Sequence, residues 1–269
     1  MGVPIFSVII PMKNAAEFVT ETVNSLFAQT FTDWEAIIVD DCSTDGGKST
    51  GIIIDFQKKS SKITLVELKV GKGSSGARNE ALKRVKGRYI AFLDADDIWH
   101  PDYLQTMYNH IQDCKIENAA VFYCGYRRMN DDCSKKMLSD YAAPGLKTYW
   151  DLLKHCPIFP SITIVDTQKL KQPVCFREEF KSLRDDYVYL LEILRQNLVA
   201  VGFEDIIVDY RMRTDSMTAS KKKMIKPQWR VYRTALKLNL FQCIFFEICW
   251  ALNGIKKYYF SKNKNSHGC

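Results

Sequence analysis

The sequence lacks several patterns that define common protein classes. Its nine cysteines contain no Cys-x-x-Cys pair, which favours reduced thiols over a disulfide framework or a zinc site. No secretory signal opens the chain, because the first apolar run, at 6–10, is far too short. The glycine-rich loop at 71–79 matches neither the dinucleotide fingerprint nor the Walker A pattern, which argues against a Rossmann dehydrogenase and a P-loop NTPase. We therefore expect a cytoplasmic protein of another class.

Acidic residues are scarce towards the C-terminus. Residues 221–269 hold eleven of the 38 Lys and Arg residues but only one of the 31 acidic residues, a formal charge of +10. The first 220 residues carry −3, so the net charge of +7 arises from this tail alone. Such a split indicates an anionic surface as the partner of the tail.

The first hundred residues alternate short apolar runs with amphipathic segments. This alternation indicates an α/β fold with a mainly parallel, Rossmann-like central sheet and helices on both faces. In such a sheet, ligands bind at the carboxyl ends of the strands. We predict strands at 5–10, 34–39, 63–68 and 89–93, with helices at 15–28, 43–56 and 77–85.

The pattern is less regular beyond residue 102. At 269 residues and 46% hydrophobic content, the chain can still bury one substantial core. We expect helices at 101–114, 149–154, 186–196 and 226–252, strands at 119–126 and 161–165, a strand pair at 198–210 and a surface loop at 130–141.

The predicted strand at 89–93 ends in three carboxylates, within the segment Asp-Ala-Asp-Asp at 94–97. Mg²⁺ and Mn²⁺ take oxygen ligands from one or two carboxylates and from substrate phosphates. Asp94 and Asp96 are therefore candidate ligands of a metal–diphosphate complex. The alternative is that Asp96 and Asp97 only cap the next helix.

Two further clusters follow predicted strands. Asp40 and Asp41 end the strand at 34–39, where a carboxylate can accept hydrogen bonds from a nucleobase or a ribose hydroxyl, although a turn or helix cap is the alternative. The glycine-rich loop runs into a helix, so its N–H groups and the guanidinium of Arg78 could bind a diphosphate. A flexible turn is the alternative there.

In their order along the chain, these segments resemble the family 2 glycosyltransferases, which have the nucleotide-diphospho-sugar transferase (GT-A) fold. The resemblance covers residues 5–218 and rests on six short motifs. They are Val-Ile-Ile-Pro-x-x-Asn at 8–14, Leu-Phe-Ala-Gln-Thr at 26–30, Trp-Glu at 34–35, Ile-Val-Asp-Asp-x-Ser-Thr-Asp at 38–45, Gly-Ala-Arg-Asn at 76–79 and Asp-Ala-Asp-Asp at 94–97.

The resemblance implies roles for these residues. The nucleobase is expected near Pro11 and Asp41, the ribose at Asp94, and Mn²⁺ or Mg²⁺ at Asp96 with Asp94. A segment at 210–218 resembles one that lies near the phosphates, so Arg211 or Arg213 could clamp the diphosphate, with solvated surface charge as the alternative. The expected nucleotide-sugar site comprises Pro11, Asn14, Asp40, Asp41, Arg78, Asp94, Asp96 and Arg211.

Family members also carry an acidic pair, often Glu-Asp, at the start of a helix beside the acceptor. Asp185 and Asp186 fit this position, and the resemblance implies that Asp186 is the base, although the unusual Asp185 leaves open which of the two acts. The base takes the proton of the acceptor hydroxyl as this hydroxyl attacks the anomeric carbon. A metal stabilises the departing nucleoside diphosphate. Attack opposite the leaving group inverts the anomeric centre.

The basic tail includes a mostly apolar run of twelve residues, 241–252, which is too short to span a bilayer about 30 Å thick. Flanking basic and aromatic residues suit an anionic membrane surface, and we expect 221–264 to bind one. A core helix with a solvated basic face and nucleic-acid binding are the alternatives, and we expect no nucleic-acid partner. Enzymes of the family that assemble bacterial glycans use lipid-linked acceptors, so the resemblance favours a peripheral position on the cytoplasmic face of the inner membrane.

Residues 1–220 are expected to form the GT-A domain, with a nucleotide-binding half at 1–100 and an acceptor-binding half at 101–220, followed by a basic amphipathic helical extension at 221–269. The predicted function is metal-dependent, inverting transfer of one sugar from a nucleotide-diphosphate sugar, expected to be a UDP-sugar, to a glycan or lipid-linked acceptor in surface-polysaccharide or lipopolysaccharide synthesis. The Gln-x-x-Arg-Trp motif of processive members is absent, so the enzyme is expected to be non-processive.

Two alternatives belong to other classes of function. A sugar-phosphate nucleotidyltransferase shares the fold but needs a glycine- and arginine-rich triphosphate loop, which 7–14 lacks. A non-catalytic, membrane-associated binding module on a transferase scaffold is the other alternative. The joint presence of Asp41, Asp96 and Asp186 argues against such a module.

Overall fold

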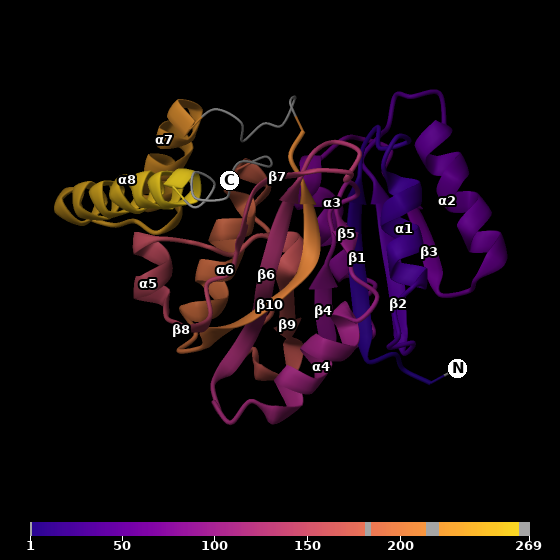
Figure 1. Cartoon of the computed structure of the whole chain (residues 1–269), viewed down its shortest axis with the longest axis horizontal. Helices are drawn as coiled ribbons and strands as arrows, with labels where there is room; N and C mark the ends of the chain where they lie inside the picture. Colours follow the sequence, from indigo (N-terminus) through magenta and orange to yellow (C-terminus); the bar gives the residue numbers. More distant parts are fainter. Residues whose placement is uncertain (1, 181–183, 214–220, 264–269) are drawn as a thin grey trace.

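A single ten-stranded sheet runs through the protein (Figure 1). The computed structural model describes residues 2–180, 184–213 and 221–263. Two predictions extend beyond these ranges: residues 214–218 of the segment expected near the phosphates, and residue 264 of the segment expected to bind a membrane, lie outside the described residues. The strand order is β3-β2-β1-β4-β9-β6-β10-β5, with β7 on β6 and β8 on β10. The strands are β1 (Phe6–Met12), β2 (Trp34–Asp40), β3 (Ile63–Glu67), β4 (Tyr89–Phe92), β5 (Ile98–Trp99), β6 (Ala119–Met129), β7 (Lys136–Tyr141), β8 (Gly145–Lys147), β9 (Thr163–Asp166) and β10 (Val199–Arg211).

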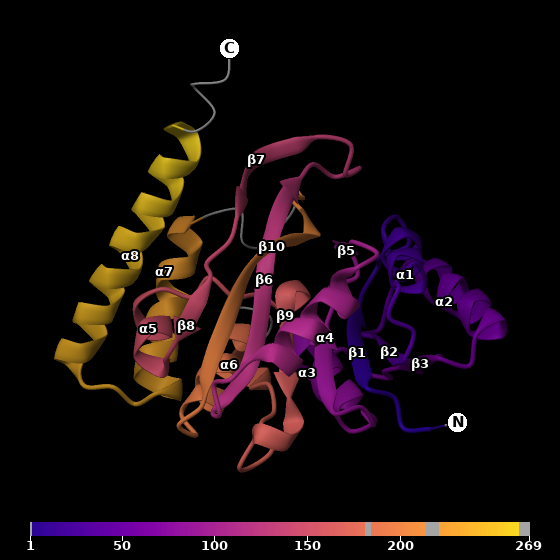
Figure 2. The same ribbon diagram turned by 60° about the horizontal axis from the view of Figure 1, so that its bottom comes forward.

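Helices pack on both faces of the sheet (Figures 1 and 2). Strands β3, β2, β1 and β4 are parallel, as predicted, and their apolar runs are long because helices cover them on both sides. The expected α/β fold is thus present. The helices are α1 (Val19–Phe27), α2 (Lys48–Lys59), α3 (Gly73–Leu82), α4 (Tyr103–Asp113), α5 (Tyr149–Lys154), α6 (Asp185–Leu194), α7 (Lys221–Arg230) and α8 (Leu240–Asn263).

The second half of the sheet is mixed. Strand β9 runs antiparallel to both β4 and β6, whereas β6 and β10 are parallel. The surface loop predicted at 130–141 is present only at 130–135, because 136–141 form the edge strand β7. The predicted strand pair at 198–210 is also wrong, because β10 is one strand whose register on β6 shifts between Gly202 and Ile206. The exposed edge strand β7 and the irregular long strand β10 both lack the alternation of apolar and polar residues by which strands are identified in a sequence.

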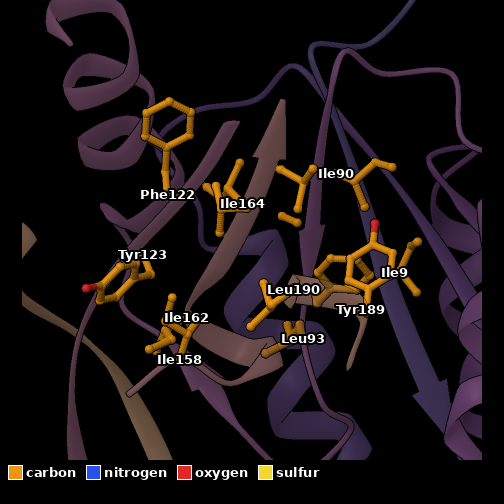
Figure 3. Close-up of a cluster of buried hydrophobic side chains, with 14 of the residues drawn as sticks. Ile9, Ile90, Leu93, Phe122, Tyr123, Ile158, Ile162, Ile164, Tyr189 and Leu190 are labelled. Atoms are coloured by element: carbon orange, nitrogen blue, oxygen red, sulfur yellow. The ribbon is translucent and has the colours of Figure 1, made fainter. Parts of the chain in front are cut away.

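The main core lies between the sheet and the helix that follows the predicted acidic pair. Figure 3 shows Ile9 and Ile90 from neighbouring strands gathered with Tyr189 and Leu190 of α6. All four side chains are at most 3% exposed. Because burial of each such side chain contributes about 1.5–3 kcal/mol, this packing holds the start of α6 against the ends of the strands.

The C-terminal helices join the same core. Val231 and Tyr232 are fully buried, and the Tyr232 hydroxyl donates to the carbonyl of Leu153 over 2.8 Å. Both views place α8 beside α7 and α5, at the far end of the molecule from α2 (Figures 1 and 2).

The single helix predicted at 226–252 is wrong, because it is interrupted. A π-helical turn (Val231–Ala235) follows α7, and Lys237 then adopts a left-handed φ of 54°. Reciprocal hydrogen bonds between Asn239 and Gln242 start α8 afresh, as in a capping box.

Gly87 marks a close approach between the chain before β4 and β1. Its amide donates to Ser7 Oγ over 2.8 Å, and a Cβ at Gly87 would lie 2.7 Å from the Ser7 nitrogen. Since this neighbour is backbone, it cannot rotate away. The close approach leaves room for glycine alone.

We predict that Gly87→Ala destabilises the protein by about 1–3 kcal/mol, as overpacking does. Differential scanning calorimetry should show a Tm lowered by about 2–4 °C per kcal/mol. Gly51→Ala is the matched control, because a Cβ there has nothing within 4 Å and alanine favours the α2 helix. A Gly87→Ala melting temperature equal to that of Gly51→Ala would contradict the prediction.

Candidate active site

A cavity of about 850 Å³ opens at the carboxyl ends of β1, β2 and β4. Parallel strands bring their carboxyl ends to the same edge, which places residues after each strand around one space. The predicted site residues that line the cavity are Pro11, Asp41, Arg78, Asp94, Asp96, Asp185, Asp186, Arg211 and Arg213.

Asp41 connects the strand ends to the glycine-rich loop. Its carboxylate accepts the amides of Lys72 and Gly73, at 2.5 and 3.0 Å, and forms an ion pair with Lys13 Nζ at 3.3 Å. It is 3% exposed, so these contacts hold it rigidly at the cavity wall. Lys13 is a site residue that sequence reasoning missed, because a single lysine after a strand carries no distinctive signal.

Asn14 and Asp40 do not line the cavity. Asp40 accepts both the amide and the hydroxyl of Ser43, and Asn14 accepts the Thr44 amide over 2.6 Å. Asn14 itself has a left-handed φ of 49°, a conformation that asparagine tolerates better than most residues. Both side chains therefore brace the loop that follows β2.

The acidic turn after β4 contains three carboxylates in different environments. Asp94 forms an ion pair with Arg78 at 2.7 Å, and Asp96 forms one with Arg213 at 3.4 Å. Burial, and next the negative charge of Asp94, raise the pKa of Asp96. Burial likewise raises the pKa of Asp97 well above its usual range. Asp97 lies inside the protein, where it accepts hydrogen bonds from the Arg211 amide and the Ser161 hydroxyl and so orders the acidic turn.

The two arginines predicted to contact a diphosphate are both buried. Arg78 is 5% exposed and contacts Asp94 and Asp185. Arg211 is 3% exposed and donates to the carbonyl of Asp96 and, over 2.7 Å, to Glu21. These contacts make both arginines organisers of the cavity wall.

Asp185 and Asp186 differ sharply although they are neighbours. Asp185 is 3% exposed and accepts Ser75 Oγ at 3.0 Å and Arg78 Nη1 at 3.2 Å. Asp186 is half-buried and lines the cavity. Burial, and next the charge of Asp185, raise the pKa of Asp186 to about 6. A carboxylate with that pKa can accept a proton near neutral pH.

Three aromatic side chains and one further arginine complete the lining of the cavity, and the sequence analysis identified none of them as site residues. Tyr126, Phe159 and Tyr210 pack edge to face at 4.8 and 5.2 Å, although they come from three distant segments. Arg184 also lines the cavity, immediately before the acidic pair. Its position directly before Asp185 and Asp186 was the one feature of the sequence that could have identified it as a site residue.

The acidic turn suits a hard cation that also binds substrate. In the part of the chain that the structure describes, no group of three or more His, Cys, Asp or Glu side chains could hold a metal. Asp94 and Asp96 nevertheless both line the cavity, and their mutual repulsion would be relieved by a divalent cation. Mg²⁺ and Mn²⁺ need only one or two carboxylates when phosphates supply further ligands.

Comparison with known proteins places this site in a family. Residues 7–162 match the model of glycosyl transferase family 2. The chain is 33% identical to the putative teichuronic acid biosynthesis glycosyltransferase TuaG of Bacillus subtilis, over 94% of this chain and 97% of that protein. It is 32% identical to the UDP-Glc:alpha-D-GlcNAc-diphosphoundecaprenol beta-1,3-glucosyltransferase WfgD of Escherichia coli, over 94% and 95%.

Solved structures share the fold. TarS 1-349 of S. aureus in complex with UDP-GlcNAc gives a TM-score of 0.67 at 21% identity, over 87% of this chain and 67% of that one. The mannosyltransferase PcManGT of Pyrobaculum calidifontis, in complex with GDP-Man and Mn²⁺, gives 0.65 at 18% identity, over 89% and 66%. The GT-A fold predicted from the sequence is confirmed, and this chain belongs to glycosyl transferase family 2.

Proposed function

We propose that the protein is an inverting, non-processive glycosyltransferase that moves one sugar from a UDP-sugar to a lipid-linked acceptor in surface-polysaccharide synthesis. The main observation is that Asp186, with a pKa of about 6, lines the same cavity as the acidic turn. The names of the relatives agree, since one acts on a diphosphoundecaprenol acceptor with UDP-Glc and another belongs to teichuronic acid biosynthesis.

In this proposal, residues 1–100 bind most of the nucleotide-sugar donor and residues 101–220 bind the acceptor. Pro11 and Asp41 would hold the base, Asp94 the ribose, and Asp96 the metal with Asp94. Lys13 adds a cation whose side chain is about half exposed beside Asp41. Its charge would attract a nucleotide phosphate into this half of the cavity.

Asp186 performs the proton transfer in this mechanism. The acceptor hydroxyl loses its proton to Asp186 as its oxygen bonds to the anomeric carbon, and the bond to the nucleoside diphosphate breaks on the opposite side. When bound, Mn²⁺ or Mg²⁺ would offset the negative charge that develops on the departing diphosphate. The attack is direct, so the sugar leaves with inverted configuration.

Asp185 is the weaker candidate for the base. Its carboxylate accepts hydrogen bonds from two serine hydroxyls and the Arg78 guanidinium, which fix it inside the protein. The charge of Asp185 is also a cause of the raised pKa of Asp186. We therefore assign Asp185 to positioning and tuning, and proton transfer to Asp186.

We predict that Asp186→Asn lowers kcat by about 10²- to 10⁴-fold, the usual contribution of a general base. In the wild type, kcat/KM should fall as the pH drops below about 6, because protonated Asp186 cannot accept a proton. The measurement is release of UDP from UDP-sugars with a lipid-linked acceptor, across pH 5–8. Wild-type turnover by Asp186→Asn would refute its role.

We predict that Asp96→Ala weakens UDP binding in the presence of Mn²⁺ by about 10- to 100-fold, the usual effect of removing a side chain that supports a metal site. Titration calorimetry of UDP binding in Mn²⁺ and in EDTA measures how much of the UDP affinity depends on the metal. The variant should lack this metal-dependent part of the affinity. Asp55→Ala, an exposed acid on α2, is the matched control. Equal Mn²⁺ dependence in Asp96→Ala and wild type would remove Asp96 from the metal site.

We also propose that the C-terminal segment binds an anionic membrane surface on the cytoplasmic side. None of the described helices is long and apolar enough to cross a bilayer. One side of α8 nevertheless exposes large apolar side chains, while Cys243 and Phe246 on the opposite side are buried. Helical spacing of 3.6 residues per turn brings the exposed side chains to a single face. This outer face of α8 comprises Leu240, Phe241, Ile244, Phe245, Ile248 and Leu252, which are 44–86% exposed.

We predict that the combined change Phe241→Ser, Phe245→Ser and Ile248→Ser reduces binding of the full-length protein to phosphatidylglycerol vesicles by about tenfold or more. Three apolar side chains would no longer enter the interface. Co-sedimentation measures the bound fraction, with Val70→Ser as the control at a site that is 70% exposed elsewhere. Unchanged binding by the triple variant would reject the outer face as the contact.

A further inference from the structure

Arg184 lies where the acidic pair meets the C-terminal helices. It immediately precedes α6, adopts a left-handed φ of 70°, and lines the cavity. Its guanidinium lies 5.1 Å from the ring centre of Trp250 on α8 and 5.8 Å from that of Tyr187. The two rings support the guanidinium through cation–π contacts, which leave the N–H groups in its plane available to a ligand.

Among the residues that the structure describes, no carboxylate pairs with Arg184, in contrast to the other three arginines that line the cavity. Arg78, Arg211 and Arg213 each form an ion pair of 2.7–3.4 Å. Within the described residues, Arg184 forms no ion pair within 4 Å, and its Nε is buried without a hydrogen-bond partner. A guanidinium held in a cavity with unused donors is a site for an anion.

Two acidic groups face Arg184 from the elements packed around it. Asp186 follows it on α6, and Arg184 counteracts the upward shift of the Asp186 pKa. Glu247 on α8 has both oxygens buried without hydrogen bonds, and burial raises its pKa although Arg184 opposes this. Because burial favours the neutral form of Glu247, this residue compensates the arginine charge only in part.

We propose that Arg184 binds a phosphate of the acceptor, so that the cavity selects acceptors that carry a phosphate or diphosphate next to the sugar. This inference rests on the proposed transfer to a lipid-linked acceptor. It assigns the anion to the acceptor because Arg184 lies beside the acidic pair and contacts α8, whereas the residues proposed to hold the base, the ribose and the metal lie in 1–100.

The arrangement matches the chemistry of a lipid phosphate. Arg184 adjoins Asp186, so a phosphate on the guanidinium would place the attached sugar next to the proposed base. A guanidinium fork recognises phosphate through parallel N–H···O bonds. Trp250, which supports the fork, lies on the opposite side of the helix from the outer face of α8, so a single helix would contact both the phosphate and the lipid.

The test uses the full-length protein and geranyl diphosphate as the probe. Saturating UDP and Mn²⁺ occupy the donor site, and titration calorimetry then measures the affinity for geranyl diphosphate. Arg184→Gln should weaken this affinity by about tenfold or more, since a charged hydrogen bond is lost. Arg184→Lys should bind geranyl diphosphate more tightly than Arg184→Gln, because lysine keeps the positive charge. It should bind less tightly than the wild type, because lysine lacks the guanidinium fork. Arg84→Gln, an exposed arginine on the body, should bind as the wild type does.

A second titration with UDP and Mn²⁺ alone separates the two sources of phosphate. Unchanged UDP affinity in Arg184→Gln supports an acceptor site and shows that the variant is folded. Reduced UDP affinity with unchanged geranyl diphosphate affinity would assign Arg184 to the donor and overturn the proposal. Equal geranyl diphosphate affinity in wild type and Arg184→Gln would also overturn it. These binding results do not depend on sugar turnover, so failure of the proposed transferase activity would be recognised separately.

Discussion

The site is organised around one buried cation. The guanidinium of Arg78 on α3 joins Asp94, after β4, to Asp185, at the start of α6. These acids are 91 residues apart in the sequence, yet one side chain holds them at the same cavity. Breaking a buried ion pair typically costs about 3–5 kcal/mol, so the separation between the acidic turn and the acidic pair is a stable property of the fold.

The same cation explains why two adjacent aspartates differ. Arg78 and two serines donate hydrogen bonds to the buried Asp185 carboxylate and fix its position. Within the described part of the chain Asp186 lacks such a set of donors, and its burial, followed by the charge of Asp185, raises its pKa to about 6. Environment, rather than residue type, separates a structural carboxylate from one suited to proton transfer.

The C-terminal helices connect this chemistry to the surface. The buried side of α8 joins the core through Phe246 and contacts Arg184, a residue that lines the cavity, through Trp250. Its opposite side exposes an apolar face. The described side chains of α8 therefore pack against the rest of the protein along one side. One helix thus supports a residue of the cavity wall and exposes an apolar face at the surface.

The sequence by itself determined the parallel strands β1 to β4 and the residues at their ends. Continuous apolar runs identify strands buried on both faces, and a parallel sheet brings their carboxyl ends together. Asp41, Asp94 and Asp96 could be placed at one edge on this basis. The family could be recognised because six short motifs occur in its order along the chain, and three of them, at 8–14, 38–45 and 94–97, lie at the ends of these strands.

Only the tertiary structure decided which side chains face the cavity. Asn14 and Asp40 are at strand ends but brace a loop, whereas Arg184 and Tyr126 enter the cavity from distant segments. The strand β7 and the break before α8 were likewise missed, because exposure and capping hide the usual periodicity. Local patterns encode elements and their ends, but contacts between remote segments and the pKa shifts that they cause depend on how the whole chain packs.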